Sequence, residues 1–490
     1  MPAALQRALN VLLAMAVVLP PFLALQRGML GASSKLQTVL WCSPALVLLL
    51  VVYYRLHPYL LFLGFVIPFT IPPFLGHRPI PLNMVFPLLV LAGGIARLCL
   101  GINPAPRTDR RVNLPMILIS VLSLGWIAMD RPGMASMGAG MGGAWEAMLA
   151  VAGLSAYWGC LSLRGITPHW GRLVKTIWVV STIVLIVVSI ENIVKQLPLA
   201  DIVSNWFWPT GWWFYGLALG YALKIWRKES RVLPLLPAYL LAAIIMINGL
   251  LSGFRSRILF APLMAGSAFW VSGFRKQTIL AIVAFSLLCL GVANTNLYER
   301  FPARAQRVLS VVRIETRTTR AVTIYGHGET GPKSLWRKEL WSRAMRMIQE
   351  KPWLGHGYAF SSSLLLADLA SATDLYEARM RGVATAGQFH NLALNVMYFN
   401  GIPAGLLFCY VWILSFIHLV QLASRHDGWK GTLFVGMLVY AVSETGQALM
   451  NGGGEDFLAT CIWIGLVQAF RAADEHARTS TPPLEPAPIA

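Results

Sequence analysis

The sequence predicts an all-α integral membrane protein, a polytopic bundle of about 12–14 transmembrane helices with one large, partly helical loop outside the membrane. Charged residues make up only 12% of the 490 residues and hydrophobic residues 56%, whereas soluble globular proteins average about 25% charged residues. The apolar residues also fall into uncharged runs close to the roughly 20 residues that a helix needs to span a bilayer. Most of the chain is therefore expected to lie in lipid.

Fourteen apolar runs are candidate spans, each with boundaries uncertain by a few residues. The first run follows Arg7 like a signal peptide, but it has no small-x-small cleavage site, so we expect it to be retained. The run at 143–162 carries a charge, Glu146, which a membrane-spanning helix rarely tolerates. The runs are 8–25, 37–53, 58–75, 82–100, 113–129, 143–162, 174–194, 208–225, 233–251, 258–273, 277–294, 392–419, 431–449 and 457–471.

Basic residues of the short loops predict the orientation, because cytoplasmic loops carry an excess of Lys and Arg. With the N-terminus in the cytoplasm, the basic clusters fall inside, and an even number of spans returns the C-terminus to the same side. The long segment 296–389 then lies outside the cytoplasm. The clustered residues are Arg107, Arg110, Arg111, Arg164, Arg172, Arg227, Lys228, Arg231, Arg275, Lys276, Arg425 and Lys430.

Four parts follow from this arrangement. The segment 1–295 is an N-terminal bundle of about 11 spans, 296–389 is an extracytoplasmic loop subdomain, 390–471 holds the last membrane helices, and 472–490 is a Pro-rich cytoplasmic tail expected to be disordered. The loop contains 14 Lys or Arg residues against eight Asp or Glu. A basic loop outside the membrane suits a diphosphate or another polyanion as ligand.

The loop is expected to contain two helices. The first covers Leu335 to Glu350, ends before Pro352, and keeps Arg337 away from its apolar face. The second is expected at about 362–380. The apolar stripe of the first helix, at helical spacing, is Trp336, Leu340, Ala344, Met347 and Ile348.

Several function classes are not expected. The formal net charge is +19, but no basic face or RNA-binding motif accompanies it, so no nucleic-acid partner is predicted and cationic loops beside anionic membrane lipids explain it better. The six cysteines form no CxxC pair, so neither a metal site nor a disulfide framework is predicted. No Walker A sequence indicates a nucleotide, and Glu444, Glu455 and Asp456 are expected to be structural.

Two arginines stand at a helix end on the outer side, Arg255 and Arg257. Arginines in this position often only reach toward lipid headgroups. A guanidinium fork on a phosphate group is the functional alternative, because its planar geometry allows bidentate binding.

Histidines supply the candidates for proton transfer. His390-Asn391 lies where the loop re-enters the membrane, on the same side as the arginines, and a neutral imidazole there can accept a proton from a sugar hydroxyl. A lone histidine is more often structural. His356, between two glycines, is the rival candidate, whereas His327 lies in a Gly-rich stretch and is set aside.

Five elements follow one another in an order that resembles the O-antigen ligase and Wzy-type polymerase superfamily. They are Ser256-Arg257 at a helix end, Arg337-x-x-x-Trp341 in the loop helix, Pro352-x-x-Gly355-x-Gly357, His390-Asn391, and a turn from Gly401 to Gly405. The likeness covers about 230–420. Two features depart from the family pattern: Asn400 stands where many relatives have Glu, and about 14 spans exceed the 12 usual for ligases.

The resemblance implies a GT-C-like membrane glycosyltransferase that needs no metal or cofactor. Its donor is a glycan on undecaprenyl diphosphate at the periplasmic face of a bacterial inner membrane, and its acceptor is a sugar of the lipid A core. A Wzy-type polymerase would instead use a second lipid-linked glycan as acceptor. A transporter or flippase of a lipid-linked glycan is the alternative from another class, although its charges would be expected near the membrane midplane.

The resemblance also implies roles for individual residues. His390 is expected to accept the proton of the acceptor hydroxyl, and Arg257 and Arg337 to stabilise the diphosphate leaving group of an inverting displacement. Further substrate-binding residues expected from the motifs are Arg255, Asn391, Trp341, Gly355 and Gly357.

Overall fold

Ten membrane helices in the computed structural model coincide with ten of the predicted spans. They are α5 (Arg110–Asp130), α6 (Ala144–Leu161), α7 (Trp170–Val194), α9 (Pro209–Tyr221) with its π-helical continuation η3 (Ala222–Trp226), α11 (Leu236–Leu251), α12 (Arg257–Val271), α13 (Arg275–Ala293), α18 (Leu392–Arg425), α19 (Gly428–Asn451) and α20 (Gly454–Ser480). Helix α20 therefore runs nine residues past the predicted boundary at 471.

The structure describes only part of the chain, and two of the predicted spans, 8–25 and 37–53, lie outside it, as does the predicted helix at 362–380. The described residues are 88–95, 109–130, 144–161, 169–194, 209–226, 236–251, 257–301, 333–358 and 387–480, with short pieces at 70–71, 80–81, 305–306, 309, 312 and 382–384.

Six described helices are long and apolar enough to cross a membrane: α5, α7, α13, α18, α19 and α20. Helix α13 shows the expected lipid-facing surface, since Leu280 is 69% exposed and Leu288 63% exposed despite their hydrophobic side chains. Together these features confirm an all-α polytopic membrane protein, as the composition predicted.

A short antiparallel pair, β1 (Thr70–Ile71) and β2 (Ile80–Pro81), differs from the prediction. Strand β1 falls inside the run 58–75 that was expected to be helical. Prolines at 72 and 73 follow it directly, and proline cannot continue a helix because it lacks the N–H group and clashes with the preceding turn. The prediction of a helix is therefore wrong at Thr70 and Ile71.

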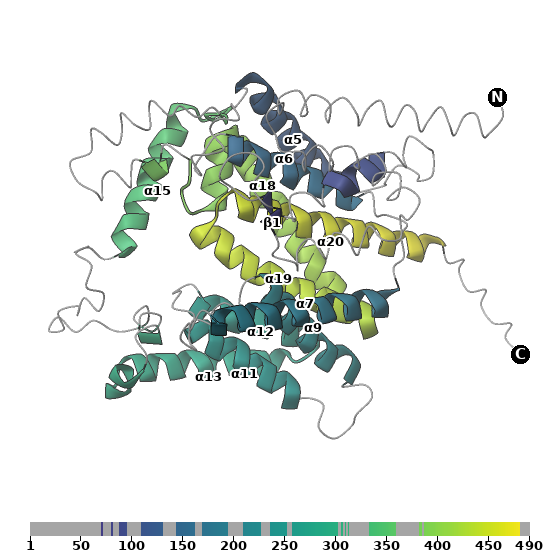
Figure 1. The fold of residues 1–490 in the computed structure, drawn as a ribbon, viewed down its shortest axis with the longest axis vertical. Helices are drawn as coiled ribbons and strands as arrows, with labels where there is room; N and C mark the ends of the chain where they lie inside the picture. The colour runs from purple at the N-terminus through teal and green to yellow at the C-terminus, as the bar shows by residue number, and fades with distance from the viewer. Residues whose placement is uncertain are drawn as a thin grey trace, which may run out of the picture.

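Helix α19 lies at the centre of the bundle and contacts α9, α12, α18, α20 and α7. On one side of it lie α5, α6, α18 and α20, and on the other lie α7, α9, α11, α12 and α13 (Figure 1). Glycines allow α9 and α19 to approach closely: a Cβ atom on Gly216 would come within 3.0 Å of the Gly436 backbone. Such small-residue contacts are typical of helix packing in membranes.

Ion pairs join helix ends at one end of the bundle, which we call the basic end. Arg471 of α20 pairs with Asp109 at 2.9 Å, just before α5. Lys224 of η3 lies 3.7 Å from Asp427, between α18 and α19. The ends of α5, α18, α19, α20 and η3 that the prediction put on one side of the membrane therefore do lie together.

The opposite end, which we call the loop end, carries the described parts of the predicted extracytoplasmic loop. Helix α15 (Lys333–Glu350) stands crosswise to α20 there (Figure 1). Its bounds match the predicted helix, and Leu340, Ala344 and Ile348 are fully buried, which confirms the position of its apolar face. The predicted division of the chain into four parts remains a prediction.

Candidate functional site

A hydrogen bond joins the loop helix α15 to the residues just before α18. The indole Nε1 of Trp341 donates to the backbone carbonyl of Phe389 at 2.9 Å. Arg337 is half-buried and lies four residues before Trp341, hence on the same face of α15 and about 6 Å along its axis. Two motifs 48 positions apart, Arg-x-x-x-Trp and His-Asn, thus meet at one place.

His390 has a left-handed backbone, with φ of 52°, and no other non-glycine residue in the described part of the chain has a positive φ. Its neighbours hold it in this conformation. The Asn391 side chain accepts the Leu394 N–H at 3.1 Å and donates to the Leu449 carbonyl at 3.1 Å, so it caps α18 and ties it to α19. Such conformations cost free energy and are concentrated at functional sites.

A second asparagine completes the support of His390. The side-chain oxygen of Asn395 accepts the Phe389 N–H at 3.0 Å, while its amide nitrogen donates to the Gly452 carbonyl at 3.1 Å. Asn395 is buried. The residues just before and after His390 are therefore fixed to the turn between α19 and α20.

Helix α18 is broken at Gly401, where φ is 88° and ψ is 163°, and Pro403 follows. The segment 352–358 supplies the missing hydrogen bonds: the N–H groups of His356 and Gly357 donate to the carbonyls of residues 398 and 399 at 2.7 and 3.0 Å, and the Ile402 N–H donates to the carbonyl of residue 352 at 2.8 Å. Broken helices are tolerated in membrane proteins where such partners exist.

Glycines make this contact possible. A Cβ atom on Gly355 would lie 2.6 Å from the backbone of residues 399–401, one on Gly401 would clash with the Trp353 carbonyl, and one on Gly357 would clash with the Asp130 carboxylate. The structure thus gives Gly355 and Gly357 close backbone packing. Their predicted role in binding substrate stays a prediction.

His356, the rival histidine, is used within the fold. Its ring Nε2 lies 2.7 Å from the Met347 carbonyl of α15, and the ring stacks on Tyr398 with centroids 4.6 Å apart. The imidazole therefore links α15 to α18. The choice of His390 for proton transfer stays a prediction.

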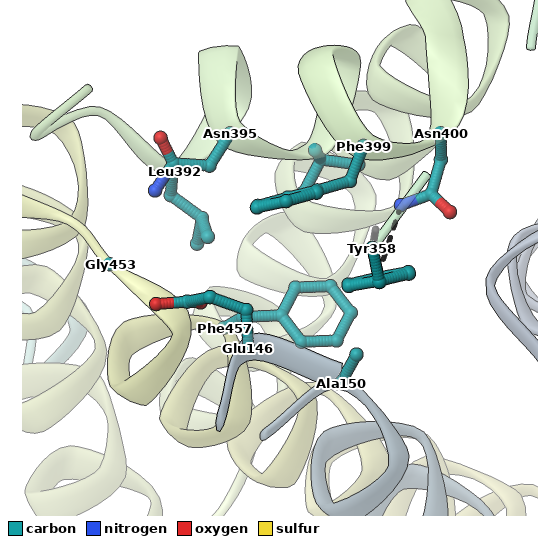
Figure 2. A pocket seen from close by; sticks show the side chains of 10 residues that line it. Glu146, Ala150, Tyr358, Leu392, Asn395, Phe399, Asn400, Gly453 and Phe457 are labelled. Atoms are coloured by element: carbon teal, nitrogen blue, oxygen red, sulfur yellow. Dashed lines mark hydrogen bonds between the residues drawn. The ribbon is translucent and has the colours of Figure 1, made fainter. Parts of the chain in front are cut away.

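A small pocket lies beneath the first turns of α18 (Figure 2). Its volume of about 20 Å³ is enough for a water molecule and too small for a sugar ring. Glu146 of α6 lines it and is only 6% exposed. The Gln388 amide donates to the Glu146 carboxylate at 3.3 Å, so the pocket is linked to the segment that carries His390.

Neutral polar groups line the other side of this pocket. The Asn400 amide donates to the Tyr358 hydroxyl at 3.4 Å (Figure 2). Its oxygen accepts from the Ser123 hydroxyl at 2.9 Å. Burial raises the pKa of Tyr358 to about 12, so its phenol stays protonated at neutral pH. Asn400 therefore joins α5, α18 and the loop without adding charge.

The two arginines of the first motif are less fully described. Helix α12 begins at Arg257, while Arg255 lies outside the described residues. Phe260, in the first turn of α12, packs closely against Gly446 of α19. Gly446 lies one helical turn before residue 449, whose carbonyl accepts a hydrogen bond from Asn391. The start of α12 thus lies at the loop end, separated from His390 by α19.

Two acidic residues that looked isolated in the sequence come together. Glu444 of α19 and Asp456 of α20 are buried, and their side chains hydrogen-bond to each other. Asp456 also accepts the Gly453 N–H at 2.7 Å. The pair fastens α20 to α19 beneath the turn that supports Asn395. Within the described ranges, no cluster of three His, Cys, Asp or Glu side chains could hold a metal ion.

The structure therefore brings Arg337, Trp341, His390 and Asn391 together, and it places the start of α12 at the same end. Sequence reasoning missed the contributions of Glu146 and Asn395. A carboxylate in an otherwise apolar run was a usable signal for Glu146, since charges inside membrane helices are costly and usually functional. No signal in the sequence pointed to Asn395, because its role depends on a hydrogen bond to Gly452, 57 residues away.

A polytopic membrane bundle with a loop helix fastened over a broken helix is the class of protein that this fold and site define. A family model described as "O-Antigen ligase" matches residues 238–409, which contain all five motif elements. An O-antigen ligase of Pseudomonas aeruginosa is 28% identical over 204 residues, 41% of this chain and 39% of that protein. The chain thus aligns with about two fifths of the length of that curated relative. Both matches support the resemblance to the O-antigen ligase and Wzy superfamily that the order of its motifs predicted.

Proposed function

We propose that the protein transfers a glycan from an undecaprenyl-diphosphate carrier to a sugar hydroxyl of the lipid A core, at the outer leaflet of a bacterial inner membrane. The likeness to the O-antigen ligase family supports glycan transfer of the ligase type in general. The choice of donor and acceptor, the inverting course and the independence of metal are parts of the proposal. So is the orientation, with both termini in the cytoplasm and the loop end in the periplasm.

The hydrogen bond from Trp341 to the Phe389 carbonyl is the observation that supports this proposal best. Arg337 lies one helical turn along α15 from Trp341, and Trp341 contacts Phe389, the residue before His390. A reaction that expels a diphosphate from a sugar needs a cation for the leaving group and a base for the attacking hydroxyl. In this proposal Arg337 is the cation and His390 is the base.

The proposed step is a direct displacement at the anomeric carbon of the donor. The acceptor oxygen forms the new bond to this carbon, the bond to the diphosphate oxygen breaks, and the leaving group departs with the electron pair. The proton of the acceptor hydroxyl passes to the His390 imidazole. Arg337, with Arg257 at the start of α12, stabilises the charge that develops on the diphosphate.

His390→Asn tests this step without disturbing the backbone, because asparagine tolerates the left-handed conformation better than most residues. We expect transfer to fall about a hundredfold or more, with unchanged expression, melting temperature and donor binding. The assay uses the purified protein in nanodiscs with a polyprenyl-diphosphate-linked oligosaccharide and a lipid A-core acceptor. Transfer at the rate of the unsubstituted protein would contradict a role for the imidazole.

The same assay separates the alternatives by acceptor. A ligase extends the lipid A core, whereas a Wzy-type polymerase joins two lipid-linked units in its absence. A flippase would move the donor across the bilayer without forming a glycosidic bond. Product only from the two lipid-linked substrates would replace the ligase proposal with the polymerase.

A further inference from the structure

A second hollow lies at the basic end, away from the proposed catalytic residues. Its volume is about 520 Å³, and it is formed by the first turns of α7 and α19. The side chains that line it are His169, Trp170, Arg172, Lys175, Trp429 and Lys430. None is acidic, and two are tryptophans, which favour the boundary between headgroups and hydrocarbon.

The charges of this hollow are only partly compensated. Arg172 and Lys175 are exposed, and no acidic side chain in the described part of the chain pairs with either. Lys175 instead lies 5.2 Å from the centre of the Trp429 ring. Lys430 is the exception, since it binds Asp474 at 2.9 Å. Among the described residues, at least two cations thus have no acidic partner.

The backbone adds to this positive potential. Helices α7 and α19 both begin here, and the first N–H groups of a helix have no partner within it. The Asp427 side chain makes no capping hydrogen bond to α19 and lies 3.7 Å from Lys224 instead. Two positive helix ends therefore point toward the same hollow as the cations.

An apolar stripe leads from the hollow along α7. It continues the face of Arg172 and Lys175 at helical spacing, and its residues are about half exposed. Eleven residues of helix are about 16 Å long, which is close to the hydrocarbon depth of one leaflet, roughly half of 30 Å. The stripe consists of Val179, Ile183, Ile186 and Ile190.

We propose that this hollow binds the phosphate headgroup of an anionic phospholipid, with an acyl chain lying along the stripe on α7. A phosphate there meets Arg172 and Lys175 and both helix ends, while the two tryptophans flank the glycerol region. A soluble phosphate would use the cations but make no contact with the apolar stripe. The site is independent of glycan transfer at the other end.

Charge removal tests the site. In Arg172→Gln/Lys175→Gln, we expect phosphatidylglycerol to bind roughly thirtyfold more weakly, at about fivefold for each charge lost near a membrane surface. Native mass spectrometry of the full-length protein measures lipid retention after titration with phosphatidylglycerol or phosphatidylcholine. The matched control is Arg275→Gln/Lys276→Gln, which removes two exposed charges at the same end, one of them beside Trp270 at 5.6 Å.

Selective retention of phosphatidylglycerol that is lost in the first variant and kept in the control supports the proposal. Equal losses in both variants would reduce the effect to general surface charge and overturn it. Equal retention of phosphatidylcholine would also overturn it. A third arm adds inorganic phosphate in large excess: complete displacement of a long-chain lipid would identify a soluble-anion site instead. Transfer activity is not the readout, so failure here leaves the proposed function unaffected.

Discussion

The imidazole of His390 owes its position to hydrogen bonds made by its neighbours. Asn391, Asn395 and Trp341 bind the backbone on either side of it. A left-handed conformation in a non-glycine residue costs about 1–3 kcal/mol, and these bonds offset that cost. Their consequence is that the backbone that carries the imidazole is fixed in advance, which would lower the entropy lost in the proposed reaction.

Arg337 provides the most direct test of the leaving-group side. Arg337→Ala should reduce transfer about a hundredfold or more and weaken donor binding, since an oriented charged donor of this kind is commonly worth that much. Arg337→Lys should recover only part of the loss, because lysine keeps the charge without the bidentate fork. Initial rates at several donor concentrations separate the two effects.

Lys338→Ala is the control for this pair, because Lys338 is exposed and adjacent on the same helix. It removes one charge from α15 at a neighbouring position. If it reduced transfer as much as Arg337→Ala, the general charge of the loop would explain the effect, and the assigned role of Arg337 would be wrong.

Single residues were predictable to different degrees. His390 and Trp341 belong to motifs with fixed spacing, so the sequence identified them as candidates without showing that they meet. Glu146 was noticed only as a charge that a span tolerates poorly. Its link to Gln388 depends on two segments 242 positions apart, which local sequence patterns do not encode.

The break in α18 and the segment 352–358 form one structural element, although about 40 residues separate them. Trp126 and Asp130 at the end of α5 complete it: the Trp126 indole donates to the Leu354 carbonyl at 2.6 Å, and Asp130 accepts the Tyr358 N–H at 2.5 Å. The loop is thereby held between α5 and α18. Helix α15 and the turn that carries His390 pack against this element.

Gly401→Ala should destabilise this element strongly. The substitution forces a side chain into a left-handed conformation and against the Trp353 carbonyl, with an expected cost of about 2–4 kcal/mol from strain and overpacking together. The melting temperature in detergent should fall and transfer should fall with it. Gly125→Ala in α5 is the control, since its Cβ would have no neighbour within 4 Å. An unchanged melting temperature in Gly401→Ala would contradict the close packing.

Helices were the most predictable elements. The hydropathy of the runs placed ten of them, because length and apolarity are what a bilayer requires; most ends agree within a few residues, but α18 and α20 extend well past their predicted C-terminal ends. The break at Gly401 was not predicted as such: the run 392–419 reads as one continuous span, and a glycine with a nearby proline is tolerated in many unbroken membrane helices. Whether the helix breaks depends on the segment 352–358, which supplies hydrogen bonds to the backbone at Gly401.

On the scale of the whole molecule, the two ends of the bundle carry different structural features. Ion pairs and basic helix ends gather at one end, and the loop with the proposed catalytic groups covers the other. The charge bias of the short loops predicts that the basic end faces the cytoplasm. The proposed phospholipid site and the proposed transfer site then lie in opposite leaflets.

Cysteine labelling tests this orientation. In a cysteine-free background, Lys338→Cys on α15 should react with a membrane-impermeant maleimide in intact spheroplasts, because the loop end is expected to be periplasmic. Arg425→Cys at the end of α18 should react only after permeabilisation. Both native side chains are exposed in the structure. The reverse pattern would refute the orientation and, with it, the periplasmic reaction.

The broken α18 also has a consequence for how the chain is made. Its partner loop is synthesised about 40 residues earlier, a delay of roughly 2–8 s at typical elongation rates, and α5 earlier still. When Gly401 leaves the ribosome, the groups that bind its unpaired backbone already exist and have a helix to dock on. The break in α18 thus needs no late rearrangement of a finished bundle, because both segments that hold it are made before it.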